Sequence, residues 1–204
     1  MKVLLACEES QAVTKEFREL GHEAYSCDML ETSGSNPEWH IQGDALEVMG
    51  TGAEWDMIVA FPPCTYLSVA GNTHFNIEKW GDKARQRHRD RDAAFEFFMA
   101  FANADCPRVA VENPVGFVST MWRKPDQIIH PYYFGDPFQK RTCLWLKGLP
   151  LLQKTNVVEH TPRIYYKNGK SGTEWLDNAS HAERDRIRSK TFPGIARAMA
   201  TQWG

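Results

Sequence analysis

The 204-residue sequence lacks the excess of basic residues that is typical of proteins with a wholly basic nucleic-acid-binding surface. Its 24 lysines and arginines are outnumbered by 26 aspartates and glutamates, and the formal net charge is −2 at pH 7. Such a protein has no general attraction to a polyanion, so any contact with nucleic acid must come from local basic clusters. Two such clusters are present, at residues 83–91 and 184–188.

Cysteine pairs with the spacing of a zinc site or of a redox motif are also missing. The five cysteines are odd in number and lie far apart, at positions 7, 27, 64, 106 and 143. This distribution argues against a disulfide framework and indicates a reducing compartment. No histidine pair has the spacing of metal ligands, so we expect no bound metal. Apart from Cys64, we expect the cysteines to be small core residues.

Long hydrophobic runs are absent as well. The apolar run at residues 3–7 is followed at once by two glutamates and is too short for a signal peptide or a membrane span. With 42% hydrophobic residues, the chain can form one well-buried core. These features predict a single cytoplasmic domain over residues 1–204, with no membrane partner.

Short apolar runs alternate with helical patterns along most of the chain. Strands are predicted at residues 3–7, 23–27, 39–44, 55–60, 108–111 and 142–146, and the last of these is a candidate for an antiparallel strand. Helices are predicted at residues 12–20, 85–104 and 193–203, whereas residues 153–177 are left unassigned. This rhythm predicts an α/β fold with a mostly parallel central sheet and helices on both faces.

Two tripeptides follow two of the predicted strands, Pro62-Pro63-Cys64 and Glu112-Asn113-Pro114. In an open α/β sheet, substrates bind outside the carboxyl ends of the strands, so the Cys64 thiol and the Glu112 carboxyl group can converge on one pocket. A thiolate is the nucleophile suited to add to carbon 6 of cytosine, and a carboxylic acid with a raised pKa can donate to nitrogen 3. Arg141 is the candidate cation for the carbonyl group of the base.

Through these motifs the chain resembles the DNA cytosine-5 methyltransferases, in a small phage-like form. Residues 55–71 are similar to the family's nucleophile motif, residues 111–113 to its carboxyl motif and residues 139–141 to its arginine motif. Residues 190–200 resemble its closing motif, and the matches follow the family's order over nearly the whole chain. The resemblance implies a Rossmann-like S-adenosylmethionine-dependent methyltransferase fold, and transfer of a methyl group to carbon 5 of cytosine in DNA.

The resemblance also implies roles for individual residues. Cys64 adds to the base, Glu112 protonates or hydrogen-bonds nitrogen 3, and Arg141 steadies the base. The positions that match the S-adenosylmethionine site are Glu9, Ser10, Asp28, Asp44, Pro62, Thr191 and Phe192. The implied substrate is duplex DNA with a flipped cytosine, in a bacterium or a phage-infected host cell.

The chain departs from the family pattern in several places, among them Thr65 in place of a glutamine and Pro114 in place of a valine. The loop Cys7-Glu8-Glu9-Ser10-Gln11 has no glycine where the family has a glycine-rich loop, and Cys143 replaces a second arginine. The interval before Thr191 is too short for the family's large recognition domain. We therefore expect a reduced recognition region at about residues 147–188, with target specificity relaxed or supplied by a protein partner.

Several alternatives stay open. The same ring chemistry on a free pyrimidine nucleotide, transfer of a modified one-carbon group, and a non-catalytic cofactor- or DNA-binding module all fit the residues. Residues 83–91 fit either phosphate contacts or a solvated helix face. Asp28 and Asp44 are also typical of turns and helix caps.

Overall fold

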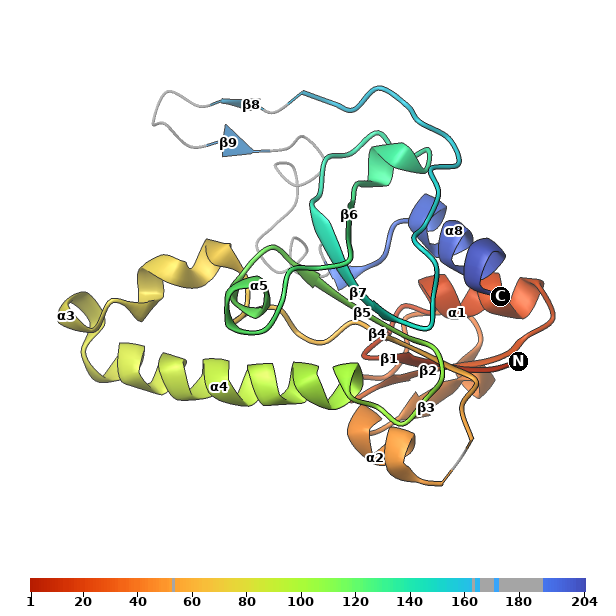
Figure 1. Ribbon diagram of the computed structural model, residues 1–204, viewed down its shortest axis with the longest axis horizontal. Coiled ribbons are helices and arrows are strands. Elements are labelled where there is room, and N and C mark those ends of the chain that lie inside the picture. The colour runs from red at the N-terminus through yellow and green to blue at the C-terminus, as the bar shows by residue number, and fades with distance from the viewer. Residues whose placement is uncertain (53, 163, 166–170, 173–188) are drawn as a thin grey trace.

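The computed structural model describes residues 1–52, 54–162, 164–165, 171–172 and 189–204 (Figure 1). Within them, seven strands form one sheet in the order β3-β2-β1-β4-β5-β7-β6. The strands are β1 Lys2–Ala6, β2 Glu23–Asp28, β3 His40–Gln42, β4 Met57–Ala60, β5 Val109–Pro114, β6 Gln127–Ile129 and β7 Thr142–Lys147. Strands β1 to β5 are parallel, and β7 is antiparallel to β5 and β6. The expected Rossmann-like α/β fold, including an antiparallel late strand, is confirmed.

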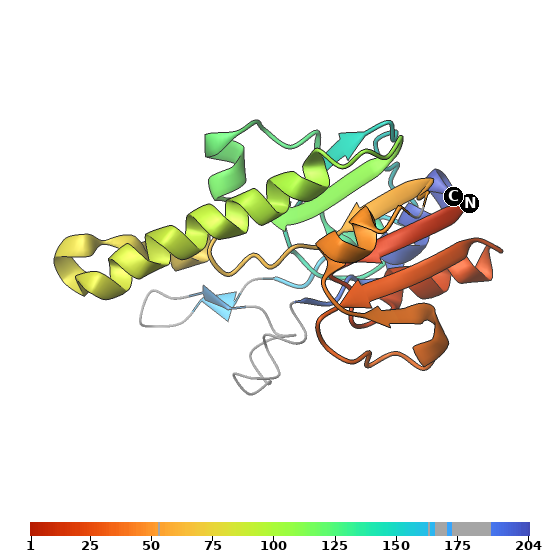
Figure 2. The ribbon, with the colours of Figure 1, turned by 90° about the horizontal axis from the view of Figure 1, so that it is seen from below.

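Helices cover both faces of this sheet (Figure 2). The α-helices are α1 Ala12–Glu19, α2 Ala45–Gly50, α3 Ile77–Trp80, α4 Asp82–Ala102, α5 Phe117–Met121 and α8 Pro193–Trp203. The 3-10 helices are η1 Pro37–Trp39, η2 Val69–Phe75 and η3 Pro131–Tyr133. A separate antiparallel pair consists of β8 Ile164–Tyr165 and β9 Ser171–Gly172. Among the described helices, none is both long enough and apolar enough to cross a membrane.

The central strands are apolar on both sides because both sides are covered. Val3 and Leu5 of β1 belong to a cluster that includes side chains of α1 and α8, whereas Leu4 and Ala6 belong to the cluster under α4. Cys27, Cys106 and Cys143 are buried as expected, and Cys7 is half-buried. The helices therefore fix the sheet from both sides and leave the strand ends to form a site.

The structure differs from the sequence prediction mainly at element ends. Strand β5 continues through Glu112 to Pro114, because these residues pair with β7. The long helix α4 begins at Asp82 instead of residue 85. The short elements α2, α3, α5 and β6 were not predicted, because elements of three to six residues carry too few positions to show a period.

Candidate active site

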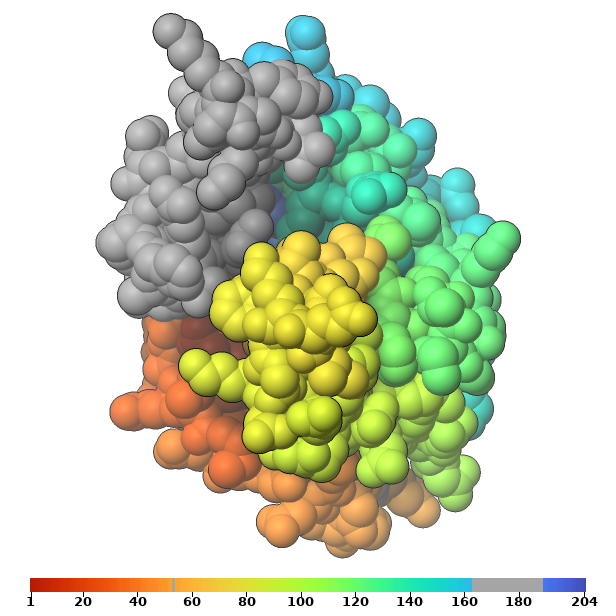
Figure 3. Space-filling view, turned by 90° about the vertical axis from the view of Figure 1, so that its left-hand side faces the viewer, coloured from red at the N-terminus to blue at the C-terminus, as the bar shows by residue number. Residues whose placement is uncertain are grey.

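The carboxyl ends of the parallel strands lie at one edge of the sheet. Ala6 of β1 is in register with Cys27 of β2 and Ala60 of β4, and Ala60 is in register with Val111 of β5. The loops that follow these strands therefore gather at this edge. η2, α3 and the first half of α4 project from the same side (Figures 2 and 3).

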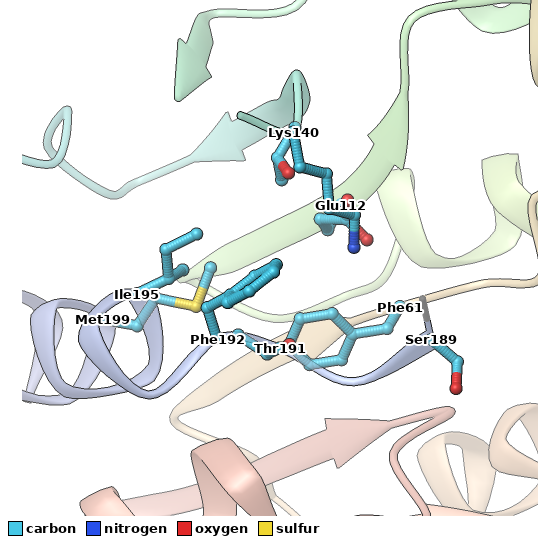
Figure 4. Close-up of a pocket in the computed structure, with 9 residues that line it drawn as sticks. Phe61, Glu112, Lys140, Ser189, Thr191, Phe192, Ile195 and Met199 are labelled. Atoms are coloured by element: carbon cyan, nitrogen blue, oxygen red, sulfur yellow. The ribbon is translucent and has the colours of Figure 1, made fainter. Parts of the chain in front are cut away.

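A small pocket, partly open to solvent and with a cavity volume of about 10 Å³, lies beside Glu112 (Figure 4). Its walls come from the residue after β4, from β5, from the start of β7 and the chain just before it, and from α8 and the chain entering it. The described lining residues are Phe61, Glu112, Lys140, Thr142, Ser189, Thr191, Phe192, Ile195 and Met199. Three residues chosen from the sequence, Glu112, Thr191 and Phe192, are thus brought to one place.

The carboxyl group of Glu112 holds its proton to higher pH than an ordinary carboxyl group does. Burial raises the pKa of its carboxyl group above the ordinary value, and the ammonium group of Lys140 partly opposes this shift. A buried carboxyl group that keeps its proton above the usual range can donate a hydrogen bond near neutral pH. Burial, and then the charge of Glu112, also raises the pKa of Cys143 to about 11, so this thiol stays protonated.

Cys64 lies on the neighbouring strand end but outside this pocket. The thiol-bearing residue is exposed, and its carbonyl oxygen accepts hydrogen bonds from the Leu67 amide at 3.1 Å and the Ser68 amide at 3.0 Å. Cys64 is not among the described residues that line the Glu112 pocket. Pro62, two residues earlier, is buried. The structure therefore presents the thiol on a turn at the surface, and the carboxyl group on the adjacent strand.

The segments that follow β4 and β5 are joined to each other. The Val69 amide donates to the Val115 carbonyl at 3.3 Å, and the Phe117 amide donates to the Leu67 carbonyl at 2.7 Å. Between these two bonds lies Gly116, where a Cβ atom would collide with the Leu67 carbonyl oxygen. The segment after Cys64 and the segment after Glu112 therefore form one unit.

Arg141 and Lys140 occupy different environments. Arg141 is exposed and is not among the described residues of the pocket. Its charge acts on His130, whose pKa is lowered first by burial and then by Arg141. Lys140 lines the pocket with Glu112 and was missed by the sequence reasoning. Strand alternation is the signal that could have found it, because Lys140 is an even number of residues from Leu144, the partner of Glu112.

The loop after β1 is built around a buried carboxylate that the sequence reasoning also missed. Glu8 is 5% exposed and accepts hydrogen bonds from the Val13 amide at 2.6 Å and the Thr14 amide at 3.2 Å, at the start of α1. The backbone is left-handed at Cys7 and Gln11, with φ of 59° and 57°. Such angles are uncommon for non-glycine residues. The loop thus reaches a glycine-like path without glycine.

Glu9 and Ser10 hold this loop in place. The Glu9 carboxylate accepts a hydrogen bond from the Ser33 amide at 3.0 Å, and the Glu9 carbonyl accepts one from the Thr32 hydroxyl at 2.6 Å. The Ser10 hydroxyl oxygen accepts a longer bond from the Ala12 amide at 3.4 Å. Both residues therefore stabilise the loop through hydrogen bonds within the protein.

Asp28 and Asp44 lie close together around Cys7. Burial is the main cause of the raised pKa of Cys27, about 11, and the charges of Asp28 and Asp44 raise it further. Burial, and then the same two charges, also raises the pKa of Cys7. Asp28 accepts a hydrogen bond from the Leu30 amide at 2.9 Å, and Asp44 caps α2 by accepting from the Leu46 amide at 2.8 Å. The turn and cap roles are therefore real. Two half-buried carboxylates at a strand edge can in addition accept hydrogen bonds from ligand hydroxyl groups.

Of the two basic clusters, only residues 83–91 can be placed. The second cluster, residues 184–188, lies outside the described residues, as does most of the expected recognition region beyond residue 162. Arg85 and Arg89 are exposed on α4, whereas Arg87 and Arg91 are half-buried. The cluster therefore has two faces with different surroundings.

No protein-family model matches the chain, and no curated protein matches it in sequence. Among solved structures, it is similar to a protein provisionally assigned as a DNA modification methyltransferase, encoded within a prophage of E. coli. The TM-score is 0.46 at 10% sequence identity, and the likeness covers 77% of this chain and 51% of the other. The chain thus spans about half the length of that protein.

Proposed function

We propose that this protein is a DNA methyltransferase that transfers a methyl group from S-adenosylmethionine to carbon 5 of cytosine. The observation that carries the proposal is the placement of Cys64 and Glu112 at adjacent strand ends that are hydrogen-bonded to each other. The sequence motifs around both residues support the cytosine-specific form of the reaction. Because the proposed substrate is DNA, we expect the protein to act in the cytoplasm of a bacterium or a phage-infected cell.

Cys64 and Glu112 have complementary tasks in this reaction. Carbon 5 of cytosine is a poor nucleophile until a thiolate adds at carbon 6. In that step the bond from Cys64 Sγ to carbon 6 forms, and electron density passes into the ring toward nitrogen 3, where Glu112 donates its proton or hydrogen bond. An exposed thiol suits a base that is flipped out of the duplex. After methyl transfer, a base such as water takes the carbon-5 proton, the bond from Sγ to carbon 6 breaks, and Cys64 leaves as a thiolate.

A positive charge beside the base would stabilise the adduct further. Arg141 is the residue that the sequence motif proposes for this role. Lys140 is the cation that lines the pocket with Glu112, and its charge opposes the raised pKa of that carboxyl group. We assign Lys140 the tuning of Glu112 and keep Arg141 as the proposed contact to the base carbonyl. The two assignments can be tested separately, because Lys140, and not Arg141, is the charged group among the described residues that shifts the pKa of Glu112.

The loops at the strand edge fit the nucleoside part of S-adenosylmethionine, which supplies the methyl group when bound. Asp28 and Asp44 are half-buried acceptors for its hydroxyl and amino groups. The amides of Val13 and Thr14 are already occupied by Glu8, so they do not serve the carboxylate of the ligand. We propose that Glu9 and Ser10 face the amino-acid part instead, that Thr191 and Phe192 close the pocket from the α8 side, and that Pro62 backs it.

The proposal is tested by expressing the protein in a host without cytosine methylation and measuring the nucleosides of the host DNA. After expression, DNA is digested and its nucleosides are weighed by mass spectrometry, with Cys64→Ser and Glu112→Gln as matched variants. We expect 5-methylcytosine with the wild type only. A heavier cytosine derivative would indicate a modified one-carbon group, and modified free nucleotides beside unmodified DNA would indicate a nucleotide substrate. Unmodified DNA and nucleotides, with retained cofactor binding, would indicate a binding module.

A further inference from the structure

Arg87 of α4 turns inward toward the segment that follows Cys64. Its Nη2 atom donates a hydrogen bond to the carbonyl oxygen of Thr65 at 3.1 Å. The guanidinium lies over the ring of Tyr66 at 4.9 Å and over that of Phe75 at 5.0 Å. The residue directly after the thiol is therefore fastened to the long helix.

Arg91, one helical turn further along α4, reaches both strand-end segments. Its Nε atom donates to the Tyr66 carbonyl at 3.0 Å, and its Nη2 atom donates to Asn72 Oδ1 at 3.0 Å. The guanidinium carbon lies 3.1 Å from the ring centroid of Phe75 and 4.7 Å from that of Phe117. Since Phe117 begins the helix after β5, one side chain bridges the Cys64 segment and the Glu112 segment.

Close packing around Arg87 shows that the segment is folded onto the arginine. A Cβ atom at Gly71 would lie 2.7 Å from Arg87 Nη2 and 3.4 Å from the Thr65 carbonyl oxygen. A contact below 3 Å forces a shift, so a larger residue at position 71 would displace the guanidinium. Glycine at this position lets the chain close over Arg87.

The other two arginines of the cluster show that this arrangement is specific. Arg85 and Arg89 are exposed, and their side chains donate hydrogen bonds to Asp82 and Gln86 of the same helix. Residues four apart lie on one face of a helix, and residues two apart lie on nearly opposite faces. Arg87 and Arg91 therefore form an inner face of α4, and Arg85 and Arg89 an outer one.

We propose that Arg87 and Arg91 are positioning residues, which hold the Cys64 segment against the end of β5 before any substrate binds. This inference rests on the proposed function, in which Cys64 must meet a base that Glu112 also contacts. A planar guanidinium can donate to a carbonyl and stack on a ring at the same time, which a lysine ammonium cannot do. Holding the reacting groups in place in advance reduces the cost of reaching the reactive geometry.

Hydrogen exchange of the free protein tests the restraint without any reference to activity. In Arg87→Gln and Arg91→Gln, amides of residues 65–75 are expected to exchange at least about tenfold faster, since a loss of 1.4 kcal/mol changes an opening equilibrium tenfold. Gly71→Ala should act in the same direction while it keeps both arginines. Arg89→Gln, with the same change of charge on the outer face, should leave exchange in this segment unchanged.

Kinetics then separates positioning from DNA binding. For Arg87→Gln, kcat on DNA should fall about 10²-fold, as expected for a misplaced reacting group, with KM for DNA unchanged. Arg87→Lys should restore only part of this loss. A variant that instead keeps kcat and loses about 0.9 from the slope of log affinity against log salt would be a phosphate contact, and the inference would be overturned.

Two further outcomes are informative. Unchanged exchange in residues 65–75, or equally faster exchange across the whole chain, would overturn the positioning role whatever the activity. Faster exchange confined to this segment in a protein whose wild type modifies no DNA would support the restraint and reject the proposed function. The two failures are therefore distinguishable.

Discussion

The side-chain amide of Asn113 donates a hydrogen bond to the carbonyl oxygen of Pro62 at 2.8 Å. Asn113 follows Glu112, and Pro62 stands two residues before Cys64. Asn113 is 1% exposed, so the bond is made in the interior, between the ends of β5 and β4. One buried amide thus fixes the relation between the two segments that carry the proposed chemistry.

The Asn113 bond predicts an unusual order of two substitutions. Asn113→Ala leaves the buried Pro62 carbonyl without its donor, which costs about 1–3 kcal/mol of unfolding free energy. Asn113→Asp keeps the shape but sets an acceptor against that carbonyl, so it should cost more. The Oδ1 atom of Asn113 has no partner within the described residues, so the oxygen offers no compensation. Denaturant unfolding measures the free energy of unfolding of both variants. A smaller loss in Asn113→Asp than in Asn113→Ala would show that the bond is unimportant.

Glu112→Gln should lower kcat by two to four orders of magnitude, about the contribution of a positioned proton donor. Glutamine keeps the shape and can still donate a hydrogen bond, but it cannot transfer a proton. Cofactor affinity, measured by calorimetry, should change little. A parallel loss of cofactor affinity and of turnover would show that Glu112 has a structural role only.

The same variant has a second, independent readout in its stability. Burial raises the pKa of Glu112 in the folded protein above the ordinary value of 4.5, which applies to the unfolded chain. Between the unfolded-state pKa and the higher folded-state pKa, the folded state therefore binds more protons than the unfolded state. Stability of the wild type therefore falls as pH rises through this interval. Glutamine does not titrate, so Glu112→Gln should gain stability relative to the wild type as pH rises from 4.5 to the raised pKa of Glu112. A difference that is independent of pH would contradict the raised pKa.

Lys140 and Arg141 should separate in the pH dependence of turnover. Lys140 lowers the pKa of Glu112, so Lys140→Gln should raise that pKa and move the alkaline limb of the kcat profile to higher pH. Arg141→Gln should leave the position of this limb unchanged and lower kcat uniformly. Matching shifts in the two variants would show that both charges act on the carboxyl group.

The outer face of α4 is the described basic surface best placed to meet phosphates. Each phosphate contact contributes about −0.9 to the slope of log affinity against log salt, so Arg85→Gln combined with Arg89→Gln should flatten it by about 1.8. Titration of duplex DNA at several salt concentrations gives the slope. If it stays the same, this face is merely solvated, and residues 123–124 and 184–190 become the candidates.

Much of the fold could be predicted because the core strands are continuous apolar runs. Val3 to Ala6 and Met57 to Ala60 are buried on both sides of the sheet, and this pattern is visible without a structure. β6 could not be predicted, because its three residues gain their order from pairing with β7. The same holds for the extension of β5 through Glu112, which depends on pairing with Leu144 in a strand much later in the chain.

Motifs at strand ends predicted some residues that the structure brings together, but side chains that act across elements were missed. Glu112, Thr191 and Phe192 line one pocket, but Cys64, which the strand-edge argument placed with Glu112, is not among the described residues of that pocket. Glu8 was missed because its role depends on the approach of α1 to the loop. The inner arginines of α4 were missed for a similar reason, since a charged run in the sequence does not show which of its faces meets the protein.

The covalent step at Cys64 is the central claim, and DNA that contains 5-fluorocytosine tests it most directly. Fluorine cannot leave carbon 5 as a proton does, so the adduct made after methyl transfer should persist. With S-adenosylmethionine present, we expect a complex that survives denaturation and whose cross-linked peptide contains Cys64. Cys64→Ser should form none, because its hydroxyl group is far less nucleophilic at neutral pH. Equal trapping by Cys64→Ser, or a cross-link at another residue, would contradict the account.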